Sequence, residues 1–182
     1  MNAPVRHEEY VGVVGATAPE VFAHLDDHIR LAAHMTKRSW KMGWGKMDVR
    51  LDAQGGKAVG SHIVLDGRVF GIHIYLDEIV TEREPPHRKR WRTVGEPRLL
   101  VVGQYTMGFD IAEIDAGARA IRLCVLIDYE LPTHGLSKIL GRLLGRMYAR
   151  WCTRQMVQDA QQAFGAGAHS QNSSPQVVTS QS

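Results

Sequence analysis

The 182-residue sequence predicts an α+β domain in which a curved antiparallel sheet of about seven strands wraps a long C-terminal helix. Three observations support this prediction. Alternating apolar residues recur through the middle of the chain, as is typical of half-buried strands. Turn residues separate these segments at short intervals, which favours antiparallel hairpins. Helical periodicity then runs from about residue 136 to residue 164, roughly 40 Å of helix that could cover the whole sheet.

A strand and a helix are expected at the start of the chain. Residues 8–16, EEYVGVVGA, alternate and are rich in valine, which predicts a strand. Thr17 and Glu20 have the spacing of a capping box, and Pro19 suits a first helical turn. The helix should then continue through apolar residues at helical spacing, namely Phe22, Leu25, Ile29 and Ala32.

Six further strands are expected before the last helix. Asp66-Gly67 has the composition of a tight hairpin turn and should separate two of them. Pro85-Pro86 should end the longest strand, because proline cannot donate a backbone hydrogen bond. The expected strands are residues 46–53, 59–65, 68–84, 87–94, 100–114 and 119–131.

The sequence indicates one domain, at residues 8–165, with a flexible N-terminus at residues 1–7. Residues 166–182 are small and polar, so they cannot offset their ordering entropy and are expected to form a disordered tail. We find no run of 18 apolar residues and no apolar signal segment, and two cysteines suit a reduced compartment. We therefore expect a cytoplasmic protein without integral membrane association.

Nucleic-acid binding is not expected. The net charge is only +3, and the basic cluster at residues 83–92 is not continued over a face. Strand alternation places Arg88, Arg90 and Arg92 on one side, where glutamates of the preceding strand can pair with them. The glutamates concerned are Glu78, Glu82 and Glu84.

No metal or cofactor is expected either. His24 and His28 are four residues apart, a spacing that can place two metal ligands on one helical face. A third ligand is not apparent in the sequence, so we expect a solvent-facing pair. Phosphate-binding, dinucleotide-binding and nucleophile-elbow motifs are also absent from the sequence.

Three stretches resemble a known superfamily, as does the order of the elements. They are ATAPEVFAHLDD (16–27), EIVTEREPPHRKRW (78–91) and GRLLGRMYARW (141–151). Together they resemble the polyketide cyclase/dehydrase-like members of the START and Bet v 1 superfamily, often called SRPBCC. The resemblance covers nearly all of residues 8–165 and implies the helix-grip fold. Members include lipid carriers, cyclases and ligand receptors, so the resemblance implies no single activity.

Such a fold would hold a hydrophobic small molecule between the sheet and the final helix. Ligand pockets are mostly apolar with a few well-placed polar groups, which suits the inner strand faces of this sequence. An ordinary packed core is the alternative interpretation. The expected ligand-binding residues are Trp91, Tyr105, Met107, Phe109, Tyr129, Met147 and Trp151.

Two functions remain open: a carrier or binding protein for a lipid-like or polyketide-like compound, and a cyclase or dehydratase. Alternation places Glu78 on the inner face and His73 and Asp77 on the outer face. A buried glutamate with a raised pKa can act as an acid or a base. Glu78, Tyr105 and Tyr129 are therefore the candidate catalytic residues.

The final helix carries a basic series and a small series, each with a spacing of four. A helical wheel predicts that its leucines, Met147 and Trp151 cover the sheet, while most of the arginines face water. Arg150 and Arg154 drift towards the apolar flank, where they could pair with sheet carboxylates. The basic series is Lys138, Arg142, Arg146, Arg150 and Arg154, and the small series is Gly141, Gly145, Ala149 and Thr153.

The role of the basic series is left open by the sequence. A basic amphipathic helix suits a membrane surface, but an apolar face that covers the sheet cannot also enter lipid. The small series favours close packing on a neighbouring element or a bend at a glycine. A homodimer is also left open.

Overall fold

The computed structural model describes residues 4–29, 44–69, 72–114 and 119–165. The expected order of strands and helices is confirmed. Ala32 and the predicted tail at residues 166–182 lie outside the described residues. The elements are β1 (Arg6–Val14), α1 (Ala18–Leu25), β2 (Trp44–Leu51), β3 (His62–Val69), β4 (Ile72–Glu84), β5 (Arg88–Arg98), β6 (Tyr105–Glu113), β7 (Ile121–Tyr129) and α3 (Gly135–Gly165).

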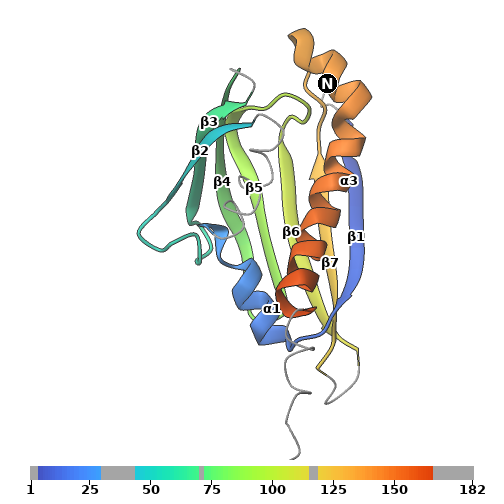
Figure 1. The fold of residues 1–182 in the computed structure, drawn as a ribbon. Helices are drawn as coiled ribbons and strands as arrows, with labels where there is room; N and C mark the ends of the chain where they lie inside the picture. Colours follow the sequence, from blue (N-terminus) through green and yellow to red (C-terminus); the bar gives the residue numbers. More distant parts are fainter. Residues whose placement is uncertain (1–3, 30–43, 70–71, 115–118, 166–182) are drawn as a thin grey trace, which may run out of the picture.

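The strands form one antiparallel sheet in the order β1-β7-β6-β5-β4-β3-β2. Strands β2 to β7 each pair with their neighbour in sequence, and β1 joins the far edge beside β7. Helix α3 packs along β1 and β7, and the sheet curves away from it towards β2 (Figure 1). The helix-grip α+β fold is confirmed. Within the described ranges, none of the helices has the length and apolar character needed to cross a membrane.

Helix α1 is shorter than the sequence predicts. The capping box forms, because the Glu20 carboxylate accepts hydrogen bonds from the Thr17 backbone and hydroxyl. The helix ends at Leu25, and Asp26 turns its carboxylate towards Arg83. Ile29 is consequently exposed and does not extend the buried stripe of the helix.

The predicted hairpin turn at Asp66-Gly67 is wrong. Strand β3 runs through both residues, and Asp66 pairs with Asp48 on one side and Tyr75 on the other. The reversal follows Val69. An Asp-Gly pair favours a turn partly because its carboxylate bonds to nearby backbone. Here the Asp66 carboxylate is engaged across the sheet instead, by Arg50 at 3.2 Å and by His73 at 2.8 Å.

The small series of α3 faces the sheet, which confirms the expected close packing. A Cβ at Gly141 would lie 2.6 Å from Pro132 Cδ, and one at Gly145 would lie 2.9 Å from the Val101 carbonyl oxygen. The helical-wheel prediction is therefore wrong for Leu143, Leu144 and Met147, which are exposed. Since the small residues occupy the contact, these bulky side chains point away from it.

Two arginines of α3 hold the helix to β1. Arg146 and Arg150 each donate an Nε hydrogen bond to Glu8, at 2.7 and 2.8 Å. Burial alone would raise the pKa of Glu8, but the hydrogen bonds from both arginines outweigh it and lower the pKa. Arg154 lies over the Tyr10 ring, 5.5 Å from its centroid. The expected pairing of Arg150 with a sheet carboxylate is confirmed, and Arg146 joins it rather than facing only water.

Candidate functional site

Strand alternation positions a carboxyl group on the inner face of β4. Glu78 is buried between the inward-facing Leu76 and Val80, as the sequence predicts. His73 and Asp77 point to the outer face, where they bond to Asp66 and His62 respectively. From Ile74 to Val80, the inner surface of β4 is therefore apolar except for Glu78.

Glu78 belongs to a row of polar side chains that crosses four strands. It pairs in register with Thr93 on β5, and Tyr105 on β6 pairs with Tyr129 on β7. The Thr93 hydroxyl accepts a 3.1 Å hydrogen bond from the Tyr105 backbone N–H, just beyond the last paired residues of β5 and β6. We call Glu78, Thr93, Tyr105 and Tyr129 the polar row.

Within the polar row, the Tyr105 hydroxyl donates a 2.5 Å hydrogen bond to Glu78 Oε1. Burial raises the pKa of Glu78 to about 7, although hydrogen bonds from Tyr105 and Trp91 act in the opposite direction. Burial and the neighbouring Glu78 charge also raise the pKa of Tyr105 well above its usual value. Near neutral pH, Glu78 can therefore both release and accept a proton, as acid–base catalysis requires.

Helix α3 places two side chains, Tyr148 and Cys152, over this part of the sheet. Tyr148 hydrogen-bonds to the Cys152 side chain, and both are near enough to Tyr105 to affect its pKa. Burial raises the pKa of Cys152 to about 12, so it is a thiol rather than a nucleophilic thiolate. The Trp151 ring lies 6.1 Å from the Tyr148 ring, and both residues are only partly buried. Sequence reasoning missed Tyr148 and Cys152, which the helical wheel alone could not assign to the inner side.

Tyr129 ends the polar row beneath α3, where a Cβ added at Gly145 would lie 3.7 Å from its ring. Its side chain is fully buried, and its hydroxyl has no hydrogen-bond partner in the described part of the chain. Leaving a buried hydroxyl unpaired costs about 1–3 kcal/mol. The Tyr129 hydroxyl is therefore a donor that a bound molecule or a water could satisfy.

The other expected ligand-binding residues fall into separate groups. Trp91 and Met107 are buried cross-strand partners on β5 and β6. Each is two residues along its strand from a member of the polar row, Thr93 on β5 and Tyr105 on β6. Phe109 lies deeper, with its ring 5.5 Å from the Phe22 ring of α1. Met147 is on the exposed side of α3, away from the polar row. The structure thus brings Trp91 and Met107 next to the polar row, to which Tyr105 and Tyr129 themselves belong. It places Trp151 beside Tyr148 on α3 and does not bring Met147 to the polar row.

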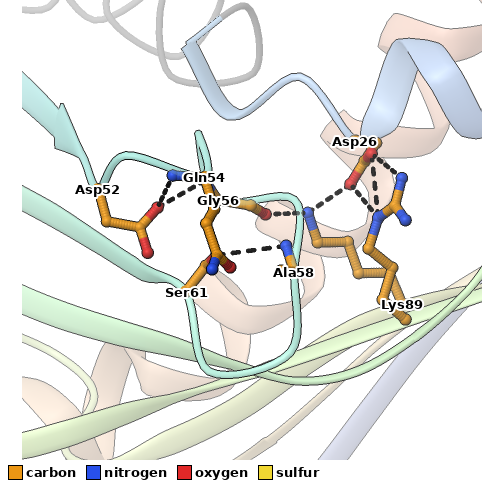
Figure 2. Close-up of polar contacts among 8 residues, drawn as sticks. Asp26, Asp52, Gln54, Gly56, Ala58, Ser61 and Lys89 are labelled. Atoms are coloured by element: carbon orange, nitrogen blue, oxygen red, sulfur yellow. Dashed lines mark hydrogen bonds and ion pairs between the residues drawn. The ribbon is translucent and has the colours of Figure 1, made fainter.

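A second buried polar group joins β5 to α1 and to the loop between β2 and β3. Lys89 Nζ is fully buried and donates hydrogen bonds to Asp26 Oδ1 at 2.5 Å and to the Gly56 carbonyl at 2.8 Å. Arg83 bonds to the other Asp26 oxygen. Figure 2 shows Lys89 between Asp26 and the loop, whose own hydrogen bonds include two to the Asp52 carboxylate. This group fastens three elements together.

The predicted solvent-facing histidine pair is wrong for His28. Its side chain is buried, and its ring meets the Trp91 ring edge-on at 5.3 Å. Burial and the nearby Lys89 charge lower the pKa of His28 to about 3, so the ring is neutral. The early end of α1 turns His28 inward. No group of three metal-ligating side chains occurs among the described residues.

The arginines on the outer face of β5 form cross-strand ion pairs. Arg88 bonds to Glu82 at 3.2 Å and to Asp110 at 2.7 Å, and Arg90 bonds to Asp110 at 2.5 Å. This confirms the ion-pairing interpretation for Glu82. Glu78 does not take part, because it faces the other side of the sheet.

Comparison with solved structures identifies the fold. The Zhui aromatase/cyclase from a Streptomyces species superimposes with a TM-score of 0.64 at 14% identity, over 94% of this chain and 100% of that chain. Norcoclaurine synthase from Thalictrum flavum, solved with dopamine and hydroxybenzaldehyde, gives a TM-score of 0.58 at 14% identity. The match covers 93% of this chain and 91% of that chain. Ara h 8.0201 gives a TM-score of 0.58 at 7% identity, and the match covers 90% of this chain and 99% of that chain.

The sequence itself matches no protein-family model and no curated protein. Structural similarity at such low identity concerns the arrangement of the backbone and not the chemistry. The chain has the helix-grip fold of the SRPBCC superfamily, the Bet v 1-like and polyketide cyclase-like proteins that its sequence resembles.

Proposed function

We propose that the protein binds a hydrophobic or aromatic small molecule that carries a hydrogen-bonding oxygen, between the polar row and α3. The observation that carries this proposal is the polar row itself: Glu78 and Tyr129 are buried hydrogen-bonding groups beside the buried apolar side chains of Leu76, Met107 and Ile127. Ligand sites combine apolar walls with a few convergent polar groups. Trp91, Met107 and Trp151 supply the walls in this proposal.

Lipid-like and polyketide-like compounds are the ligand class that suits these groups. Their hydrocarbon or ring portions match the apolar walls, and their carbonyl or hydroxyl oxygens match the polar row. The unpartnered Tyr129 hydroxyl could donate to a ligand carbonyl. Protonated Glu78 could do the same, and ionised Glu78 could accept from a ligand hydroxyl.

A cyclase or dehydratase is the second candidate function, and the Glu78 pKa of about 7 favours it. Ionised Glu78 would take a proton from a carbon between two carbonyls, and the resulting enolate would attack a second carbonyl carbon of the same chain. Glu78 would return this proton to the alkoxide that forms. It would then take the second proton of the attacking carbon and deliver it to the hydroxyl as that group leaves as water, which forms a carbon–carbon double bond. The aromatase/cyclase among the structural neighbours is consistent with this reaction class.

Calorimetric titration with 1-naphthol, an aromatic probe with one hydroxyl, tests the binding proposal. The wild-type protein should bind one equivalent saturably. Tyr129→Phe should weaken binding up to about tenfold, the value of one hydrogen bond. Tyr75→Phe is the matched control, since it removes a phenol from the outer face of β4. Equal losses in the two variants, or no saturable binding by the wild type, would contradict the proposal.

Incubation with a linear 1,3,5,7-tetraketone separates the two functions. An enzyme should accelerate its closure to an aromatic ring, with release of one water, and Glu78→Gln should remove the acceleration while the Tyr75→Phe control keeps it. A binding protein should leave the closure rate at its value in buffer. The product is measured by its aromatic absorbance and by mass.

A further inference from the structure

The N-terminal half of α3 exposes a stripe of large apolar side chains. Ile139, Leu143 and Met147 succeed one another at intervals of four and are 58%, 72% and 63% exposed. Leu144 beside them is 37% exposed. In Figure 1 the first turns of α3 project beyond the end of β1. We call Ile139, Leu143, Leu144 and Met147 the apolar stripe. Contiguous exposed apolar side chains of this kind mark interaction surfaces.

A basic stripe runs alongside the apolar stripe. Each member of the i, i+4 apolar series is followed three residues later by an arginine, and residues at that spacing are neighbours on a helix. The pairs are Ile139 with Arg142, Leu143 with Arg146, and Met147 with Arg150. Asp159 is the sole acidic residue in the sequence of α3, and it lies far from this end.

The basic side chains remain available to a partner. Arg146 and Arg150 share Glu8, yet their side chains are 63% and 60% exposed. Lys138 and Arg142 are exposed and form no ion pair with any described residue. The Glu8 contacts and the glycines packed on the sheet hold the helix in place, so both stripes are presented by a fixed surface.

We propose that the apolar stripe and the arginines beside it dock the protein on an anionic lipid bilayer. Large apolar side chains beside arginines on one helix can enter the headgroup boundary, while the basic groups meet anionic lipids. A helix whose apolar face covered the sheet could not do this. The structure removes that objection, because the small series makes the sheet contact and the bulky apolar residues face outwards. This proposal does not depend on the small-molecule function.

Sedimentation with lipid vesicles tests the docking. The full chain should sediment with vesicles of phosphatidylcholine containing phosphatidylglycerol, and much less with phosphatidylcholine alone. Arg142→Gln should weaken binding about fivefold, the effect of one basic residue near an anionic surface. Binding should also weaken as salt is raised.

The double variant Leu143→Asn with Met147→Asn should weaken vesicle binding about tenfold or more. Val59→Asn and Arg68→Gln are the matched controls, because they change exposed residues of the β2–β3 region. Equal loss in the controls, or no preference for anionic vesicles, would overturn the proposal. A different result would also overturn it: the wild type is a dimer, the double variant is a monomer, and neither binds vesicles. A second copy of the chain would then cover the apolar stripe. Tyr129→Phe should bind vesicles like the wild type, which keeps this test separate from the ligand site.

Discussion

The Tyr105 hydroxyl on β6 bonds to the Glu78 carboxyl on β4 across the intervening strand, at 2.5 Å. A buried charge is normally matched by an opposite charge. Glu78 instead has hydrogen bonds from Tyr105 and Trp91, and its pKa is about 7. The site therefore holds an acid–base group that is costly to keep ionised, which has consequences for stability.

Glu78 should make stability depend on pH. Its pKa is about 7 in the folded protein and about 4.5 when unfolded. Between these values the folded state keeps a proton that the unfolded state has released, so the free energy of unfolding falls as pH rises. Each pH unit in this window is worth about 1.4 kcal/mol, or roughly 3 kcal/mol in total.

Urea unfolding of the wild type and of Glu78→Gln between pH 4 and pH 8 measures this effect. The wild type should lose about 3 kcal/mol relative to the variant as pH rises. Comparing the two proteins cancels the titration of His28, which both retain. Parallel pH profiles would show that Glu78 ionises as an ordinary exposed carboxylate.

Lys89→Met should destabilise the protein strongly, by about 3–5 kcal/mol, because it leaves Asp26 buried with one cationic partner removed. Arg119→Met is the control, since Arg119 pairs with Glu20 in an exposed ion pair and should contribute much less. The measurement is the urea midpoint at constant m-value. Similar losses of unfolding free energy in the two variants would mean that the hydrogen bonds of Lys89 do not stabilise the packing of β5 against α1 and the loop between β2 and β3.

Gly145→Ala should destabilise the protein even though alanine favours a helix by about 1 kcal/mol. The added Cβ would lie 2.9 Å from the carbonyl oxygen of Val101 in the connection between β5 and β6, so α3 and this connection must move apart. We expect a net loss of about 1–3 kcal/mol in the free energy of unfolding. Gly165→Ala is the control, because its Cβ would meet nothing within 4 Å. A stabilised Gly145→Ala protein would contradict the close contact.

Cys152 should resist alkylation in the folded protein. It is buried, and its pKa of about 12 leaves almost no thiolate at neutral pH. Cys124 is partly exposed and should react with iodoacetamide first. Peptide mass analysis measures both sites, and unfolding in urea should remove the difference. Faster labelling of Cys152 in the native protein would show that the space under α3 is open to reagent and that burial does not protect the thiol.

The sequence predicted the fold because strand alternation and helix length are local properties. The inward direction of Glu78 and the buried face of β7 follow from a period of two, and both are confirmed. The turn predicted at Asp66-Gly67 does not form, because β3 pairs with β2 on one side and β4 on the other, and this pairing outweighs the local turn propensity. Cross-strand partners such as Asp48 cannot be read from local sequence.

The site was predicted less well, since it depends on how α3 meets the sheet. A helical wheel ranks faces by hydrophobicity, but the glycines decided which face could approach the sheet most closely. Met147 was therefore assigned to the wrong side, while Tyr148 and Cys152 were overlooked. Lys89 and Trp91 share the inner face of β5 because they are two residues apart. The partner of Lys89, Asp26, is too distant in sequence to be inferred from local patterns.

The most direct test of the central claim is a methyl NMR titration of the protein with 1-naphthol. The account predicts saturable shifts for methyl groups beside the polar row, at Leu76, Met107 and Ile127, and unchanged signals from the outer-face Val11 and Val13. Tyr129→Phe should need more probe to reach the same shifts. Inner-face signals that stay unchanged at millimolar probe, or shifts confined to Leu143 and Met147 on the apolar stripe, would contradict binding between the sheet and α3.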